Sequence, residues 1–186
     1  MEASLVNYAR PFVDKGPVVE AVKQRLIARA MALGWVCTRD MDLHLMTDGV
    51  RIEADADGDL ARFIFPADAP DVRLRSKTFS PYEMGHTVDR RELGVMVKGL
   101  EVSDGLRTRR DIPLDHPALG KGFYGLECKD EEIWRWTNGE AVLPTELWAG
   151  CRDHVILRLS LDPNAGQVWI APDTAGTPGQ HTCAAA

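Results

Sequence analysis

Residues 42–66 have the sequence Asp42-Leu-His-Leu-Met-Thr-Asp-Gly-Val-Arg-Ile-Glu-Ala-Asp-Ala-Asp-Gly-Asp-Leu-Ala-Arg-Phe-Ile-Phe-Pro66, and this stretch decides the fold. It contains three runs in which apolar and polar side chains alternate, the pattern of half-buried strands. The runs occupy residues 42–46, 50–53 and 60–66. Turns containing Asp-Gly separate them, and Asp-Gly between alternating runs is a strong short-range signal for a β-hairpin. The stretch therefore predicts antiparallel strands joined by tight turns.

Segments with strand character continue along the chain. They lie at 72–79, 93–102, 112–114, 134–143, 155–161 and 167–170. The segment 93–102 is more continuously apolar, as expected for a more buried strand, and Asp162-Pro-Asn-Ala-Gly166 is typical of a turn. Many short strands separated by regular turns predict a mainly β protein, an antiparallel β-sandwich that is jelly-roll-like in its second half.

One helix is predicted ahead of the strands, over about residues 17–34. Apolar residues recur there at helical spacing, Pro17 suits a first helical position, and Gly34 suits a C-terminal stop. Its polar face carries both signs of charge, which favours an amphipathic helix packed on a sheet over one lying on a membrane surface. We expect a single domain over residues 1–171, and a flexible Pro-, Gly-, Thr- and Ala-rich tail over 172–186.

Composition excludes some classes of function. The chain has 186 residues, is 45% hydrophobic and carries a net charge of −6, so it lacks the basic balance of a general nucleic-acid binder. No apolar run approaches the ~20 residues of a membrane span. The first residues lack the pattern of a secretory signal peptide, so we expect a cytoplasmic protein or one exported as part of a larger assembly.

Two charged clusters are interpreted as structural. The first is Arg107, Arg109 and Arg110, which lies beside acidic residues and is expected to be a solvated loop. The second is Arg90, Arg91 and Glu92, which is expected to form an ion-pair network that fixes the loop before residue 93.

Cysteine and carboxylate spacing predicts no metal site and no cofactor. None of the four cysteines forms a CxxC pair, and their spacing fits no zinc framework. Because the first residues lack a secretory signal pattern, we expect reduced thiols, with Cys37 and Cys151 in or near the core. Asp55, Asp57 and Asp59 alternate around a glycine and superficially resemble a calcium loop, but the EF-hand spacing and its distal Glu are missing. A hairpin turn explains them better.

Residue types suited to catalysis occur without a recognisable catalytic pattern. Several glutamates lie near the tryptophans at 134 and 136, and paired carboxylates can hydrolyse glycosides. Cys151-Arg-Asp-His154 holds a thiol and an imidazole, although sequence neighbours rarely give the geometry of a nucleophile and its base. There is no Gly-x-Ser-x-Gly elbow, phosphate loop or dinucleotide fingerprint. We therefore expect a non-enzymatic protein and assign no catalytic residue.

An aromatic segment carries the candidate binding site. Trp134 and Trp136 are two residues apart, so on a strand their side chains face the same side. Aromatic faces stack on sugar rings, and nearby polar side chains bind the hydroxyls. The predicted glycan-binding residues are Trp134, Trp136, Arg135, Glu127, Tyr124 and Asn138. The alternative is that one or both indoles close the core of the sandwich.

Several stretches together resemble a known family. They are Ala9-Arg-Pro-Phe-Val-Asp-Lys-Gly-Pro17, Asp42-Leu-His-Leu45, Asp71-Val-Arg-Leu-Arg-Ser-Lys-Thr78, Asp89-Arg-Arg-Glu-Leu-Gly-Val95, Gly122-Phe-Tyr124 and Trp134-Arg-Trp-Thr137. The set resembles the C-terminal accessory region of alphaproteobacterial proteins with a hedgehog/intein-type (Hint) domain. It is also similar to β-sandwich modules of polysaccharide-handling proteins. None of the cysteines opens a Hint block, so self-processing is not carried over.

Two hypotheses about function follow. The resemblance and the aromatic segment imply a non-catalytic accessory module that binds a glycan or docks onto another protein. The alternative is a structural or assembly subunit of a surface appendage or phage-like particle, associated with its spike or capsid and possibly a homo-oligomer.

Overall fold

The structure is a computed structural model that describes residues 16–84 and 87–172. The chain forms two compact units, of which the first comprises Met1–Val36 and Ile170–Ala186 and the second Cys37–Trp169. All of the predicted tail at 172–186 except Pro172 lies outside the described residues.

The helix of the first unit is α1 (Pro17–Ala32). It begins at a proline and ends where Gly34 adopts a φ of +85°, a conformation that favours glycine. The sequence thus predicted its existence and its start, and placed its end two residues too late. Its described side chains include no buried residue, and several large apolar ones are exposed. These are Val18, Val22, Leu26, Ile27 and Met31.

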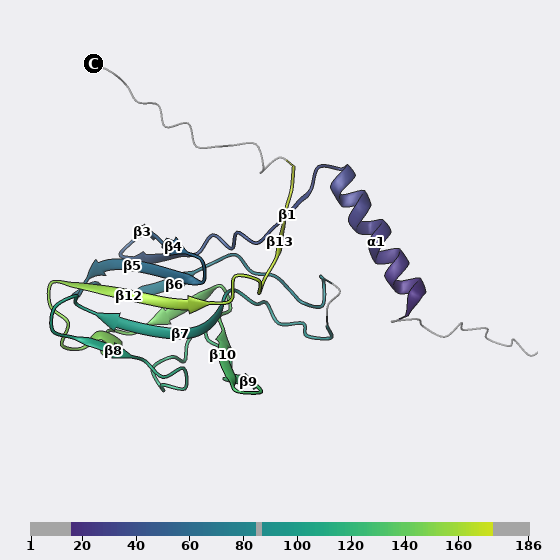
Figure 1. Cartoon of the computed structure of the whole chain (residues 1–186). Coiled ribbons are helices and arrows are strands. Elements are labelled where there is room, and N and C mark those ends of the chain that lie inside the picture. Colours follow the sequence, from purple (N-terminus) through teal and green to yellow (C-terminus); the bar gives the residue numbers. More distant parts are fainter. Residues whose placement is uncertain (1–15, 85–86, 173–186) are drawn as a thin grey trace, which may run out of the picture. The chain divides into compact units, whose positions relative to one another are not determined.

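The second unit is built on two antiparallel sheets (Figure 1). The larger sheet has the strand order β4-β5-β12-β7-β10-β9, with β8 also paired to β7. Its strands are β4 (Asp55–Asp57), β5 (Leu60–Pro66), β7 (Met96–Ser103), β8 (Arg109–Asp111), β9 (Glu127–Lys129), β10 (Glu132–Trp136) and β12 (His154–Leu161). The smaller sheet has the order β11-β6-β2-β3. Its strands are β2 (His44–Thr47), β3 (Val50–Glu53), β6 (Val72–Arg75) and β11 (Glu140–Leu143).

Three shorter elements complete the described structure. β1 (Val36–Thr38) and β13 (Val168–Ile170) form a separate two-stranded sheet, and η1 (Thr145–Trp148) is a turn of 3-10 helix between β11 and β12.

Both sheets contribute to one hydrophobic core, as the period-two pattern requires. Along β5 the exposed and buried side chains strictly alternate, and along β12 every second side chain from Val155 to Leu159 is buried. The smaller sheet buries its own alternate residues in the same way. The core includes Leu45, Phe63, Phe65, Val72, Leu74, Leu143, Val155, Leu157 and Leu159. The predicted mainly β fold, an antiparallel sandwich with one helix, is confirmed.

The first Asp-Gly turn folds as the sequence predicted, whereas the second joins β4 to β5 and not the runs at 50–53 and 60–66, which lie in different sheets. Asp48 and Gly49 both have positive φ, at 47° and 75°, which is the backbone form of the tightest hairpins, and they join β2 to β3. The three alternating aspartates lie at the β4–β5 hairpin, where Asp55 forms an ion pair with Arg62. The interpretation of these aspartates as a hairpin is therefore confirmed.

The arginine cluster at 107–110 is not simply a solvated loop, because Arg109–Asp111 forms β8. The cause is the preceding turn, in which the buried Asp104 carboxylate accepts backbone hydrogen bonds from Thr108, Arg107 and Leu106 at 2.9, 2.8 and 3.0 Å. These bonds hold the pKa of Asp104 well below its usual range. The ordered turn returns the chain along β7.

Two further expectations are corrected. The segment 134–143 is two strands rather than one, because the chain turns at Asn138 and Gly139, where φ at Gly139 is +90°, and crosses from the larger sheet to the smaller. Cys37 is exposed rather than near the core, whereas Cys151 packs against the core.

Candidate functional site

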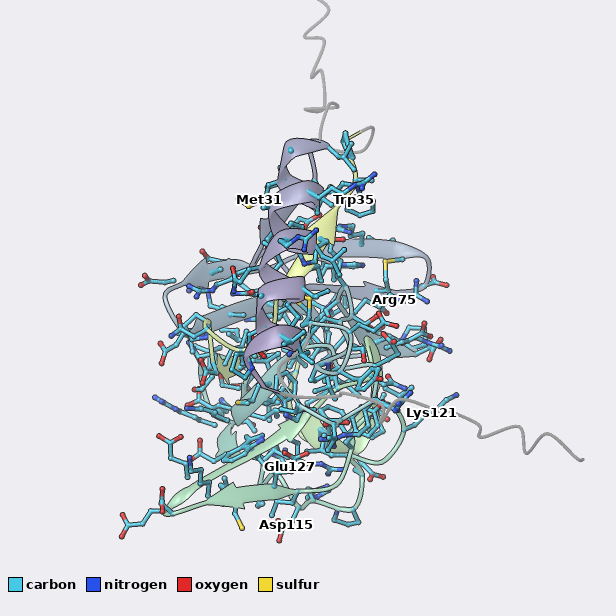
Figure 2. All side chains as sticks on the ribbon, turned by 90° about the vertical axis from the view of Figure 1, so that its right-hand side faces the viewer. Met31, Trp35, Arg75, Asp115, Lys121 and Glu127 are labelled. Carbon is cyan, nitrogen blue, oxygen red and sulfur yellow. The ribbon has the colours of Figure 1, made fainter. Side chains whose placement is uncertain are left out.

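The candidate site is built on the hairpin of β9 and β10. Lys129 pairs with Glu132 and Glu127 with Trp134, so these four side chains share one face of the hairpin. The turn consists of Asp130 and Glu131, and Asp130 adopts a left-handed φ of 55°, which aspartate tolerates better than most residues. Figure 1 shows the hairpin extending away from β5 and β12, and Figure 2 labels Glu127 on it.

The two tryptophans of β10 have different environments although they share a face. Trp136 lies opposite Met96 of β7, is only 7% exposed, and meets the ring of Phe79 edge-on at a centroid distance of 5.7 Å. Trp134 is the next residue on the same face of β10, closer to the hairpin turn, and its side chain is half-buried. Trp136 therefore belongs to the interior, and Trp134 is the indole of this pair that a ligand can reach.

Trp134 lines an open groove of about 730 Å³. The groove lies between the hairpin, the start of β7 and the end of β12. Its lining residues are Met96, Lys98, Lys129, Asp130, Glu131, Glu132, Trp134 and Asp162. An aromatic ring beside polar and charged groups is the combination that holds a sugar ring, with the ring face against the C–H groups and the polar groups against the hydroxyls.

Lys98 is held across the groove by two carboxylates. Its Nζ lies 3.1 Å from Oε2 of Glu132 and 3.5 Å from Oδ2 of Asp162. The bond to Glu132 is the main cause of a raised pKa for Lys98, which keeps the ammonium charged. The three side chains present donors and acceptors in fixed positions along one wall of the groove.

The orientation of Trp134 is set by a series of polar contacts with residues outside the groove lining. Its indole Nε1 donates to Oε2 of Glu127 at 3.2 Å, and Oε1 of Glu127 accepts from Nη1 of Arg91 at 2.7 Å. Arg91 is itself held by the carboxylate of Asp89, which raises the pKa of the guanidinium. Glu127 therefore acts on the site by positioning Trp134.

Tyr124, Arg135 and Asn138 lie near these residues but outside the groove lining. The Tyr124 hydroxyl donates to the carbonyl of Glu92 at 2.9 Å, and Arg91 lies 5.0 Å above its ring. The Asn138 side chain accepts the backbone N–H of Glu140 at 3.1 Å and so closes the turn before β11. These contacts fix the loops that surround the hairpin.

Arg135 lies on the opposite face of β10 from Trp134. Its guanidinium donates to the carbonyls of Tyr124 and Leu114 at 2.7 and 2.9 Å, and burial lowers its pKa. Because these donors already bind carbonyls of the protein, Arg135 links the loops that contain Tyr124 and Leu114.

The network predicted for Arg90, Arg91 and Glu92 has different members. Arg91 pairs with Asp89 and Glu127, and Arg90 stacks on the ring of Tyr82 at 3.9 Å. Ion pairs therefore fix the loop before β7, as the sequence predicted, but the carboxylates are those of Asp89 and Glu127 and not that of Glu92.

A second hollow of about 430 Å³ adjoins the groove at Asp162, which lines both. Its floor is apolar and includes Leu43, Ala61 and Val95, and its rim carries Arg39 and Asp40. The carboxylate of Asp162 therefore has the polar groove on one side and the apolar floor of the second hollow on the other.

The described residues hold no cluster of three His, Cys, Asp or Glu that could ligate a metal ion. Among the described residues, no hydrogen bond joins Cys151 to His154, and burial raises the pKa of the Cys151 thiol, which disfavours the thiolate that a nucleophile needs. No helix among the described residues is long and apolar enough to cross a membrane.

Comparisons with family models, with curated proteins and with solved structures found no match to this chain.

Sequence reasoning found Trp134 and Glu127 but missed Met96, Lys98 and Asp162. Lys98 alternates with apolar neighbours along a strand, which marks it as outward-facing, and Asp162 begins an evident turn. Their proximity to Trp134 depends on the pairing of β7 with β10 and β12, which local sequence patterns do not specify.

Proposed function

We propose that the chain is a non-catalytic β-sandwich accessory module, of the kind found beside Hint domains and in polysaccharide-handling proteins, and that it binds a glycan. The observation that carries the proposal is the half-buried Trp134 ring in an open groove whose wall holds Lys98, Glu132 and Asp162. A sugar has apolar C–H faces and polar edges, and this groove offers a counterpart for each.

The positioning of Trp134 supports the same proposal. An indole already held by Glu127 loses little side-chain freedom when a ligand stacks on it, so less of the binding energy is spent on ordering the site.

The proposal is tested by calorimetry with bacterial capsular polysaccharides and with neutral, amino and acidic oligosaccharides. We expect saturable binding that Trp134→Ala abolishes or weakens about tenfold or more. The stacking of one ligand ring on one aromatic side chain contributes on the order of 1–3 kcal/mol to binding. The matched control is Ile133→Ala, which removes an exposed side chain from the same strand but from its other face.

A second candidate function is that of an assembly subunit of a surface appendage or phage-like particle. The specific observation in its favour is the set of exposed apolar side chains on α1, including Val18 and Met31 at 69% and 63% exposure. Such surface commonly marks an interface. Size-exclusion chromatography with light scattering distinguishes the two functions, because assembly predicts a defined oligomer that Val18→Ser and Met31→Ser dissociate.

A further inference from the structure

We infer that the Trp134 groove selects glycans that carry free amino groups, namely unacetylated hexosamine units, over N-acetylated and acidic glycans. This inference rests on the proposed glycan binding and specifies its substrate class. It follows from the charges around the groove and from the state of the Trp134 indole.

The formal charge of the groove is negative. Four carboxylates and two ammonium groups line it, which gives −2 for this surface of a chain whose net charge is −6. Glu132 and Asp162 share Lys98 between them, so one of their two negative charges is not balanced. A cationic ligand is attracted by this field, and a uronate is repelled.

The hairpin turn adds two carboxylates at the groove edge. Asp130 and Glu131 are exposed and have no ion-pair partner among the described residues, and Lys129 directly precedes them in the chain. A ligand ammonium can reach these carboxylates without breaking an existing ion pair. The turn is therefore the position at which an amino group adds to affinity.

Trp134 offers its ring surface rather than its N–H to a ligand. The N–H is already donated to Glu127, so the ligand meets the π face, whose quadrupole attracts cations. Cation–π attraction and the nearby carboxylates act in the same direction, toward an ammonium-bearing sugar.

The test compares three tetrasaccharides by calorimetry at pH 5.5, where the glucosamine amine is protonated. They are the tetramers of glucosamine, N-acetylglucosamine and galacturonic acid. We expect the glucosamine tetramer to bind about three- to tenfold more tightly than the acetylated one at low ionic strength, the size expected for exposed charge contacts. The preference should shrink at 0.5 M NaCl, where charges are screened.

A double variant assigns the preference to the turn. Asp130→Asn with Glu131→Gln should reduce the preference toward unity, because binding of the glucosamine tetramer weakens more than binding of the acetylated one. Asparagine also tolerates the left-handed φ at 130, so the turn itself is kept. The matched control, Asp57→Asn with Asp59→Asn, makes the same charge change at the β4–β5 hairpin, at the other edge of the sheet.

Two outcomes overturn the inference and leave the proposed function standing. They are equal or weaker binding of the glucosamine tetramer relative to the acetylated one, and a preference that the turn variant does not reduce. Failure of every oligosaccharide to bind the folded wild type overturns the proposed function and the inference with it.

Discussion

The indole nitrogen of Trp134 donates a 3.2 Å hydrogen bond to the carboxylate of Glu127. The second oxygen of that carboxylate accepts a 2.7 Å hydrogen bond from Arg91, so a salt-bridged loop before β7 and the aromatic wall of the groove are joined through one side chain. The ring is therefore held by a residue outside the groove lining, and its orientation exists before any ligand arrives. This arrangement separates the residues that position the site from those that face it.

The first prediction concerns that positioning chain. Glu127→Ala should weaken binding of any glycan that the groove accepts by a few-fold, because Trp134 then has to be ordered by the ligand. In urea unfolding, Arg91→Ala and Glu127→Ala should show a coupling of about 0.5–1 kcal/mol, as expected for a partly exposed pair. Purely additive effects in the double-mutant cycle would show that the contact does not operate in solution.

The second prediction separates the two tryptophans of β10. Trp136→Ala should lower the free energy of unfolding by about 3–5 kcal/mol, because Trp136 is 7% exposed and packs against Phe79. Trp134→Ala should cost only about 1–2 kcal/mol, since its ring is half-buried and its loss removes one hydrogen bond. Chemical denaturation measures both, and the reverse ranking would contradict the assignment of interior and groove.

The third prediction concerns the glycine of the Gly122-Phe-Tyr motif. Gly122 has a φ of +87°, and an added Cβ would lie 2.2 Å from the carbonyl oxygen of Glu140 and 2.4 Å from Cα of Ala141. Since both obstacles are backbone atoms, Gly122→Ala should destabilise the protein by at least about 2 kcal/mol.

Gly125→Ala is the matched control for Gly122→Ala. A Cβ at 125 meets no atom within 4 Å, and the φ is not in the left-handed region. Its effect on the denaturation midpoint should be small, and the two alanine variants behaving alike would contradict the close approach at 122.

The fourth prediction is a pH dependence from Asp104. Its folded-state pKa is lowered because the carboxylate accepts backbone hydrogen bonds from Thr108, Arg107 and Leu106. The resulting stabilisation is fully present above the unfolded-state pKa of about 3.9 and is lost as the pH falls through the folded-state value. Asp104→Asn should therefore lower Tm at pH 7, and the gap to wild type should narrow below about pH 4.

Thermal unfolding from pH 7 to pH 2.5 measures this gap. Asp57→Asn on the exposed strand β4 is the control, and its Tm should follow the wild type throughout. A difference in Tm between wild type and Asp104→Asn that stays constant down to pH 2.5 would contradict the claim that the ionised Asp104 carboxylate stabilises this turn.

Much of the fold could be predicted from the sequence because its signals are local. Alternation in 60–66 defines β5 directly, and Asp48-Gly49 defines the turn from β2 to β3. β8 and β9 escaped prediction since Arg109–Asp111 and Glu127–Lys129 carry mostly charged residues and little apolar alternation. Their strand form comes from hairpin pairing with β7 and β10 and not from a side-chain pattern of their own.

The candidate site could be predicted only in part, because it depends on the long-range pairing of β10 with β7. The spacing of Trp134 and Trp136 correctly placed both on one face of a strand. Only the pairing of Trp136 with Met96 shows which of the two indoles is buried in the sandwich. Arg135 has the chemistry of a sugar-binding residue, and its donors are instead directed to two loop carbonyls.

The most direct test of the central claim is a calorimetric titration of the wild type, Trp134→Ala and Ile133→Ala with the oligosaccharide panel. The account predicts saturable binding by the wild type and by Ile133→Ala, and loss of about tenfold or more in affinity for folded Trp134→Ala. Equal affinities for the two alanine variants, or no binding by the wild type to any oligosaccharide, would contradict the claim that this groove recognises a glycan.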